Sequence, residues 1–274
     1  NLGGGERRMQ LRGGAGLFEG AAANVWLTNP FQNTGAAVAF YGCGSSSELV
    51  GGARNNPACG TGVFTANTSQ LQALGGNPAP NVDFLSDRLS QPAVWKFNLA
   101  FDTELPWGGL VAGAELVHTK VKQAIYYQHL NLGAPTRTGS DGRNMYYNAA
   151  GYNSNCWTAA GATAASATGC GGTSPSSRAL NNSSYGNVTL ATATNKGGGD
   201  TLTLSLSQAP TPELRWSVAY SYATAKEVSP LTSSVALSNW RGRSNFNPNE
   251  EVSANSTYLT KDRITAQMTW TKAF

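Results

Sequence analysis

Residues 216–223, WSVAYSYA, alternate strictly between a large apolar side chain and a small or polar one. The same alternation recurs at 264–271, ITAQMTWT. Side chains on a β-strand point to opposite faces with a period of two, so each stretch predicts a strand with one apolar and one polar face. The pattern therefore favours an all-β fold of antiparallel strands.

The same period predicts about six long strands, joined by connections that are alternately long and short. We expect these strands at 8–18, 94–105, 110–128, 186–207, 215–226 and 258–272, the fourth of them interrupted by the glycine run at 197–199. The turns at 106–109 (PWGG) and 209–213 (APTPE) are short, because Pro fixes φ and Gly permits a positive φ. The other connections are long and polar, and we expect the first to be a loop of roughly seventy residues. Short turns on one side and long loops on the other are typical of a transmembrane β-barrel.

Composition excludes several classes of protein. Charged residues make up 12% of the chain, against about 25% in soluble domains. The net charge is +4 and the basic residues form no stripe, so we expect no nucleic-acid partner. No apolar run reaches the roughly 18 residues of a membrane helix, a test that a barrel escapes because only every second residue faces lipid. The polar faces carry mostly Ser, Thr, Ala, Asn and Gln, which suits a hydrated or plug-filled lumen.

The four cysteines form two local pairs within the long polar connections. We expect two loop disulfides in an oxidising compartment, with free thiols as the alternative. Metal binding is not expected, because no pair has zinc-ribbon spacing and the chain has only two histidines. The pairs are Cys43 with Cys59 and Cys156 with Cys170.

Several stretches resemble, in one order, the barrel of Oar-like TonB-dependent outer-membrane receptors. They are 12–20 (RGGAGLFEG), 25–35 (VWLTNPFQNTG), 95–107 (WKFNLAFDTELPW), 125–132 (IYYQHLNL), 233–250 (SSVALSNWRGRSNFNPNE) and 262–263 (DR). The resemblance covers nearly the whole chain and is weaker in the cysteine-bearing loops. It implies an antiparallel barrel of about 22 strands in the outer membrane of a Gram-negative cell, with a plug in its lumen. It also implies coupling to the TonB complex through that plug.

The sequence contains no counterpart of the family's plug, its TonB-box-like leader or its carboxypeptidase-regulatory-like N-terminal domain. About six strands also cannot close a barrel of the family's size. We therefore expect residues 1–274 to be a single, incomplete barrel domain, an internal fragment of a receptor. A terminal aromatic residue is typical of intact outer-membrane barrels. On the fragment hypothesis, the presence of Phe274 at the end of the sequence is coincidental.

The candidate sites are not catalytic. The sequence has no nucleophile elbow, H-E-x-x-H motif or P-loop, so we expect neither an enzyme nor a cofactor. Four candidate lumen charges, which could instead belong to a solvated wall, are Arg12, Lys96, Asp102 and Glu115. Aromatic residues that we expect to be exposed in the long connections could contact a ligand or simply pack over the barrel mouth. They are Trp26, Phe31, Tyr146, Tyr147, Trp157, Trp240 and Phe246.

The leading hypothesis is the barrel portion of a TonB-dependent transporter. It would bind a small-molecule or peptide substrate at its extracellular loops and pass it through a plug-gated lumen. Its partners would be outer-membrane lipid and, only through the plug, the TonB complex. The alternatives are a passive outer-membrane porin or structural barrel, and a soluble β-sandwich adhesin in which the apolar faces pack on each other.

Overall fold

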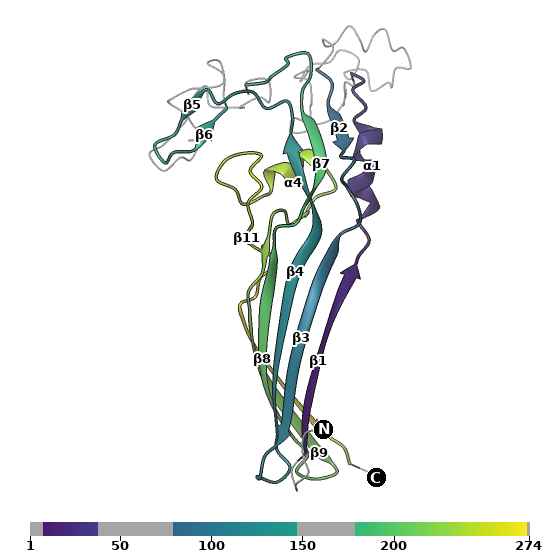
Figure 1. Ribbon diagram of the computed structural model, residues 1–274, viewed down its shortest axis with the longest axis vertical. Helices are drawn as coiled ribbons and strands as arrows, with labels where there is room; N and C mark the ends of the chain where they lie inside the picture. The colour runs from purple at the N-terminus through teal and green to yellow at the C-terminus, as the bar shows by residue number, and fades with distance from the viewer. Residues whose placement is uncertain (1–7, 38–78, 147–178, 273–274) are drawn as a thin grey trace, which may run out of the picture. The chain divides into compact units, whose positions relative to one another are not determined.

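The computed structural model describes residues 8–37, 79–146 and 179–272 (Figure 1). The chain divides into two compact units, which are described separately. The strand unit comprises Asn1–Trp26, Ser86–Tyr127 and Ala191–Phe274, and the insert unit comprises Leu27–Leu85 and Gln128–Leu190. No helix in the described ranges is long and apolar enough to cross a membrane.

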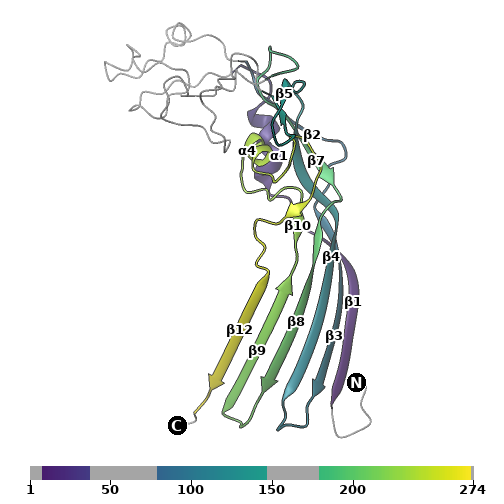
Figure 2. The same cartoon turned by 90° about the vertical axis from the view of Figure 1, so that its left-hand side faces the viewer.

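Within the described residues, six long strands form one antiparallel sheet, as the alternation predicts. They lie side by side in the order β1-β3-β4-β8-β9-β12 (Figure 2). Their bounds are Met9–Glu19 (β1), Ala93–Glu104 (β3), Val111–His129 (β4), Gly198–Gln208 (β8), Leu214–Ala223 (β9) and Asp262–Trp270 (β12). Among the described residues β1 pairs only with β3 and β12 only with β9, so the sheet is open at both edges.

The two short turns lie at the same end of the sheet, which is called the turn end below (Figure 1). In the β3–β4 turn the amide of Leu105 donates to the carbonyl of Leu110 at 2.7 Å. Gly108 and Gly109 have φ of 60° and 73°, which residues with a Cβ rarely adopt. The prediction of a tight PWGG turn is therefore confirmed. The opposite end of the strands is called the connection end.

The strand expected at 186–207, with an interruption at 197–199, is two strands, β7 (Val188–Thr194) and β8. The break comes at Gly197 and Gly198, where φ is 125° and 138°. A Cβ on Gly198 would collide with the backbone oxygen of Thr119. The glycine run is therefore a close backbone packing point between neighbouring strands rather than a loop.

The first long connection is not only a loop, and this expectation was wrong. It contains the helix α1 (Asn24–Gln32) and the strand β2 (Val82–Leu85). The third contains the short strands β10 (Lys226–Glu227) and β11 (Ala254–Asn255) and the helix α4 (Ala236–Arg241). Helix α1 has Pro30 inside it and no acidic residue in its first turn, and the N-cap of α4, Val235, makes no side-chain cap bond. Neither helix carries the usual start signals in the sequence.

In the described part of the insert unit, buried polar side chains join segments that are far apart in the chain. Its described strands are β2, the first residues of β7, and the pair β5 (Arg137–Thr138) and β6 (Asn144–Met145). The buried Asp83 accepts hydrogen bonds from Asn33, at 2.6 Å, and from Thr189. The buried Asn131 amide donates to the carbonyls of Asn182, Tyr185 and Gly186. These bonds satisfy backbone groups that an irregular chain would otherwise leave unpaired.

Candidate functional site

One face of the six-stranded sheet is apolar. Strand register places residues directly opposite each other on the same face, so each register row can be followed across all six strands. The central row is Leu11, Phe101, Ala114, Leu204, Tyr220 and Ile264. The apolar face is defined by this row and by Leu17, Trp95, Phe97, Leu99, Leu116, Leu202, Leu206, Trp216, Val218, Tyr222, Met268 and Trp270.

Most large side chains of the apolar face are exposed among the described residues. The exposed fraction of these side chains runs from 37% at Phe101 to 76% at Ile264, while Trp216 and Val218 are half-buried. A soluble protein usually keeps continuous apolar patches small, because their hydration is unfavourable. A surface of this kind indicates contact with a membrane or another protein.

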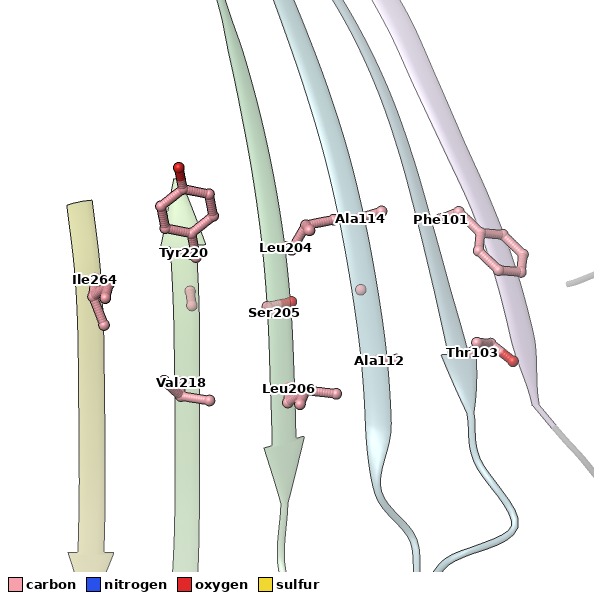
Figure 3. Close-up of a pocket in the computed structure, with 12 residues that line it drawn as sticks. Phe101, Thr103, Ala112, Ala114, Leu204, Ser205, Leu206, Val218, Tyr220 and Ile264 are labelled. Atoms are coloured by element: carbon pink, nitrogen blue, oxygen red, sulfur yellow. The ribbon is translucent and has the colours of Figure 1, made fainter. Parts of the chain in front are cut away.

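A shallow groove of about 540 Å³ crosses the apolar face (Figure 3). It forms because β4 carries the small residues Ala112, Gly113 and Ala114 between the larger side chains of its neighbours. Phe101 borders it on β3, and Leu204 and Leu206 border it on β8. The groove offers almost no polar group, so it suits a hydrocarbon chain better than a polar ligand.

The opposite, polar face holds the four charges that the sequence singled out. Arg12 Nη2 and Asp102 Oδ2 form an ion pair at 2.6 Å. Arg12, Glu115 and Arg263 lie on one register row, and Lys96 lies on the same face above the ring of Phe18, 5.8 Å from its centroid. The four residues therefore share one face of the sheet.

At the connection end, the strand unit has a buried cluster around α4. This α4 cluster consists of residues 224–261 with 125–127 and Trp26 packed against them. Its buried apolar side chains are Ile125, Tyr126, Tyr127, Val228, Ala236 and Trp240. Asn239 fixes the helix start by pairing with both the amide and the carbonyl of Ser233, at 2.9 and 2.7 Å. The indole of Trp26 donates to the same Ser233 carbonyl at 3.0 Å.

Arg243 is the buried cation of the α4 cluster, and the sequence did not single it out. Its guanidinium lies over the Tyr126 ring, 5.2 Å from the centroid. Its Nη2 donates to the carbonyl of Glu250 at 2.7 Å, while Nε and Nη1 have no hydrogen-bond partner among the described residues. Burial lowers the pKa of Arg243, and Tyr126, Glu250 and Glu251 partly oppose this effect. Nothing in the local sequence distinguishes this arginine from an exposed loop arginine.

Glu250 closes the loop that follows α4. Its carboxylate accepts hydrogen bonds from the backbone amides of Asn247 and Phe246, at 3.0 and 3.2 Å. It also accepts a hydrogen bond from the side-chain amide of Asn247, at 2.8 Å. The backbone bond from Asn247 is the main cause that lowers the pKa of Glu250. The carboxylate therefore organises this loop in its ionised form.

The described members of the candidate aromatic contacts are divided between the two units. Trp240 is buried and donates to Asn249 at 2.8 Å, so the expectation that it is an exposed loop residue was wrong. Trp26 is half-buried in the same α4 cluster, and Phe246 in the same unit is exposed. Phe31, which is 82% exposed, and the half-buried Tyr146 belong to the insert unit. Outside the described residues lie Tyr147, Trp157, Cys43, Cys59, Cys156 and Cys170.

No family model, no curated protein and no solved structure matches this chain. The features that bear on function are the two faces of the sheet and the sequence itself.

Proposed function

We propose that the chain forms part of the wall of a transmembrane β-barrel in a Gram-negative outer membrane, and that this barrel belongs to a TonB-dependent transporter. The observation that carries the proposal is the exposed apolar face. Fully burying one large apolar side chain is worth about 1.5–3 kcal/mol, so leaving so many in water is unfavourable. Lipid tails would cover them, while the sheet satisfies its own backbone hydrogen bonds.

The dimensions of the apolar face support a membrane span. From Trp95 to Glu104, β3 is about 30 Å long at about 3.4 Å per residue. A tilt of about 40° reduces this length to a height close to the roughly 25 Å apolar band of outer-membrane barrels. Trp216 and Trp270 lie near the turn end of the face and Trp95 near the connection end. Trp and Tyr are typical of the two membrane interfaces, since their rings combine an apolar body with a polar edge.

The polar face supports the transport part of the proposal. In a barrel it would line the lumen with small hydroxyl side chains and with the Arg12–Asp102 pair. The open edges at β1 and β12 require further strands in a membrane, because unpaired backbone groups are not tolerated in lipid. Substrate capture would occur at the long connections, and the TonB-dependent step is supported by the ordered sequence resemblance.

Fluorescence quenching tests the membrane part. In vesicles of brominated phosphatidylcholine we expect strong tryptophan quenching, which weakens when Trp95, Trp216 and Trp270 are changed to Phe. The matched controls are Trp26→Phe and Trp240→Phe in the α4 cluster. These changes should not reduce the fraction of tryptophan fluorescence that the lipid quenches. A chain that partitions into water, binds no detergent and shows no quenching would refute the proposal and favour a soluble sandwich.

A second measurement separates an energised transporter from a passive porin. Uptake of the transported substrate by cells that carry the protein should be lost when TonB is deleted, because the plug moves only when TonB pulls it. Uptake that persists without TonB, together with an open conductance in a planar bilayer, would support the passive channel instead.

A further inference from the structure

The apolar face ends abruptly at the connection end, and lysines follow it. One row of the face carries Leu99, Leu116, Leu202 and Tyr222 and ends at Asp262 on β12. Two rows further toward the connection end, the row reads Leu17, Trp95, Lys120, Gly198 and Lys226. Lys122 lies two residues further along β4, at a bulge opposite Ala93 and Val94, and is also exposed. These three residues, Lys120, Lys122 and Lys226, are called the lysine strip.

The three ammonium groups have no acidic partner in the part of the chain that the structure describes. Within the described residues, no lysine of the strip forms an ion pair or a side-chain hydrogen bond. The nearest acid on the face, Asp200, is already paired with His118 at 2.7 Å in the intervening row. Two further acids of the same face, Glu19 and Asp262, lie on the outer strands β1 and β12. The centre of the border between face and connections is therefore cationic.

A notch separates two of the lysines. Lys120 and Lys226 flank Gly198 in register, so their backbones stand about 10 Å apart, which is two strand spacings. The close approach of Gly198 to Thr119 forbids any side chain between them. Lysine has a flexible four-carbon stem, so both ammonium groups can turn toward one anionic group above the notch.

We propose that the lysine strip binds the phosphate groups of anionic membrane lipids whose acyl chains lie on the apolar face. This inference rests on the proposed function, since it needs the apolar face in a bilayer. The lysines directly adjoin the apolar face. This arrangement matches a lipid, because a lipid has a phosphate head group and hydrocarbon tails. An acidic protein would satisfy the lysines but would leave the adjoining apolar rows exposed.

The test compares binding of the full chain to vesicles of phosphatidylcholine alone and of phosphatidylcholine mixed with phosphatidylglycerol. We expect tighter binding to the mixed vesicles and a loss of about fivefold for each of Lys120→Gln, Lys122→Gln and Lys226→Gln. The matched control is Lys96→Gln, which removes the same charge from the polar face of the same sheet and should leave the preference intact. A triple Lys→Arg variant should also keep the preference, because it keeps the charge.

The outcomes are distinguishable. Equal binding to both kinds of vesicle, or an equal loss with Lys96→Gln, overturns the lysine strip as a lipid site while the barrel proposal stands. Binding to neither kind of vesicle overturns both proposals. Competition by inorganic phosphate as strong as that by phosphatidylglycerol would show a free-anion site and overturn the lipid assignment. Unchanged binding of the Gln variants to neutral vesicles shows that they remain folded.

Discussion

The two parts of strand β4 differ in how their side chains are buried. Over 111–120 its side chains alternate, with Ala114 and Leu116 exposed on the apolar face and Glu115 on the polar face. Over 125–127 the same strand is buried on both faces, and Tyr126 and Tyr127 pack into the α4 cluster. The first part has one exposed apolar face and one polar face, whereas the second part is buried on both faces, as in a protein core. A single strand therefore passes from one kind of surroundings to another.

The contrast has a consequence for substitution. A charge should be intolerable on the apolar face of the wall and acceptable on its polar face, whereas in the α4 cluster the existing charge is part of the packing. The following predictions test this difference, from the largest expected effect to the smallest.

The largest effect is expected for Leu204→Arg, at the centre of the apolar face. In phosphatidylcholine vesicles it should lower the free energy of unfolding by about 2–4 kcal/mol, because an arginine would lie in hydrocarbon. Urea unfolding followed by tryptophan fluorescence measures this change. The control Thr203→Arg, one residue away on the polar face and in register with Glu115, should cost much less. Equal costs would mean that the two faces see the same solvent.

Arg243→Ala should destabilise the α4 cluster by about 2 kcal/mol. It removes the contact with the Tyr126 ring and the bond to the Glu250 carbonyl. Arg243→Met should cost less, since it keeps much of the packing and removes a charge that burial disfavours. Hydrogen exchange across 224–261 measures the local opening. Exchange that is unchanged in Arg243→Ala would show that the arginine does not hold the cluster.

The Arg12–Asp102 pair should contribute only about 0.2–1 kcal/mol, because both side chains are partly exposed. A double-mutant cycle with Arg12→Ala and Asp102→Ala measures the coupling by urea unfolding. Raising the salt concentration should reduce it. A coupling well above this range would indicate that the polar face is drier than an aqueous lumen.

The smallest effect is expected for the pH dependence of the loop after α4. The pKa of Glu250 is lower in the folded state than its usual 4.5, so its bonds to Asn247 and Phe246 stabilise the loop above pH 4.5. This stabilisation should be lost as the pH falls through the lower, folded-state pKa. Hydrogen exchange at 246–250 as a function of pH measures it, and Glu250→Gln should remove the dependence. A loop that becomes more stable on acidification would contradict the sign.

Much of the sheet can be predicted from sequence. Alternation located the long strands and sorted Trp95, Phe97 and Leu99 from Lys96 and Asn98, because side-chain direction in a strand depends only on position. The lumen candidates shared a face for the same reason. The ion pair between Arg12 and Asp102 was beyond this reasoning, since it depends on the register between two strands separated by a long connection.

The α4 cluster was poorly predicted. Trp240 was expected in solvent and is buried, and Arg243 was overlooked. The connection between β9 and β12 is rich in Asn, Ser and Pro, and such a composition indicates a loop whether or not it folds onto a core. Its burial depends on Ile125 and Tyr126, which are distant in sequence.

The sequence by itself determined the strands, their two faces and the PWGG turn, because these follow from period-two alternation and from the backbone preferences of Pro and Gly. Only the tertiary structure decided the burial of Arg243 over Tyr126 and the placing of Lys120 and Lys226 on either side of Gly198. Each of these depends on close contact between segments far apart in the chain. Such contacts depend on register and packing, which local patterns do not encode.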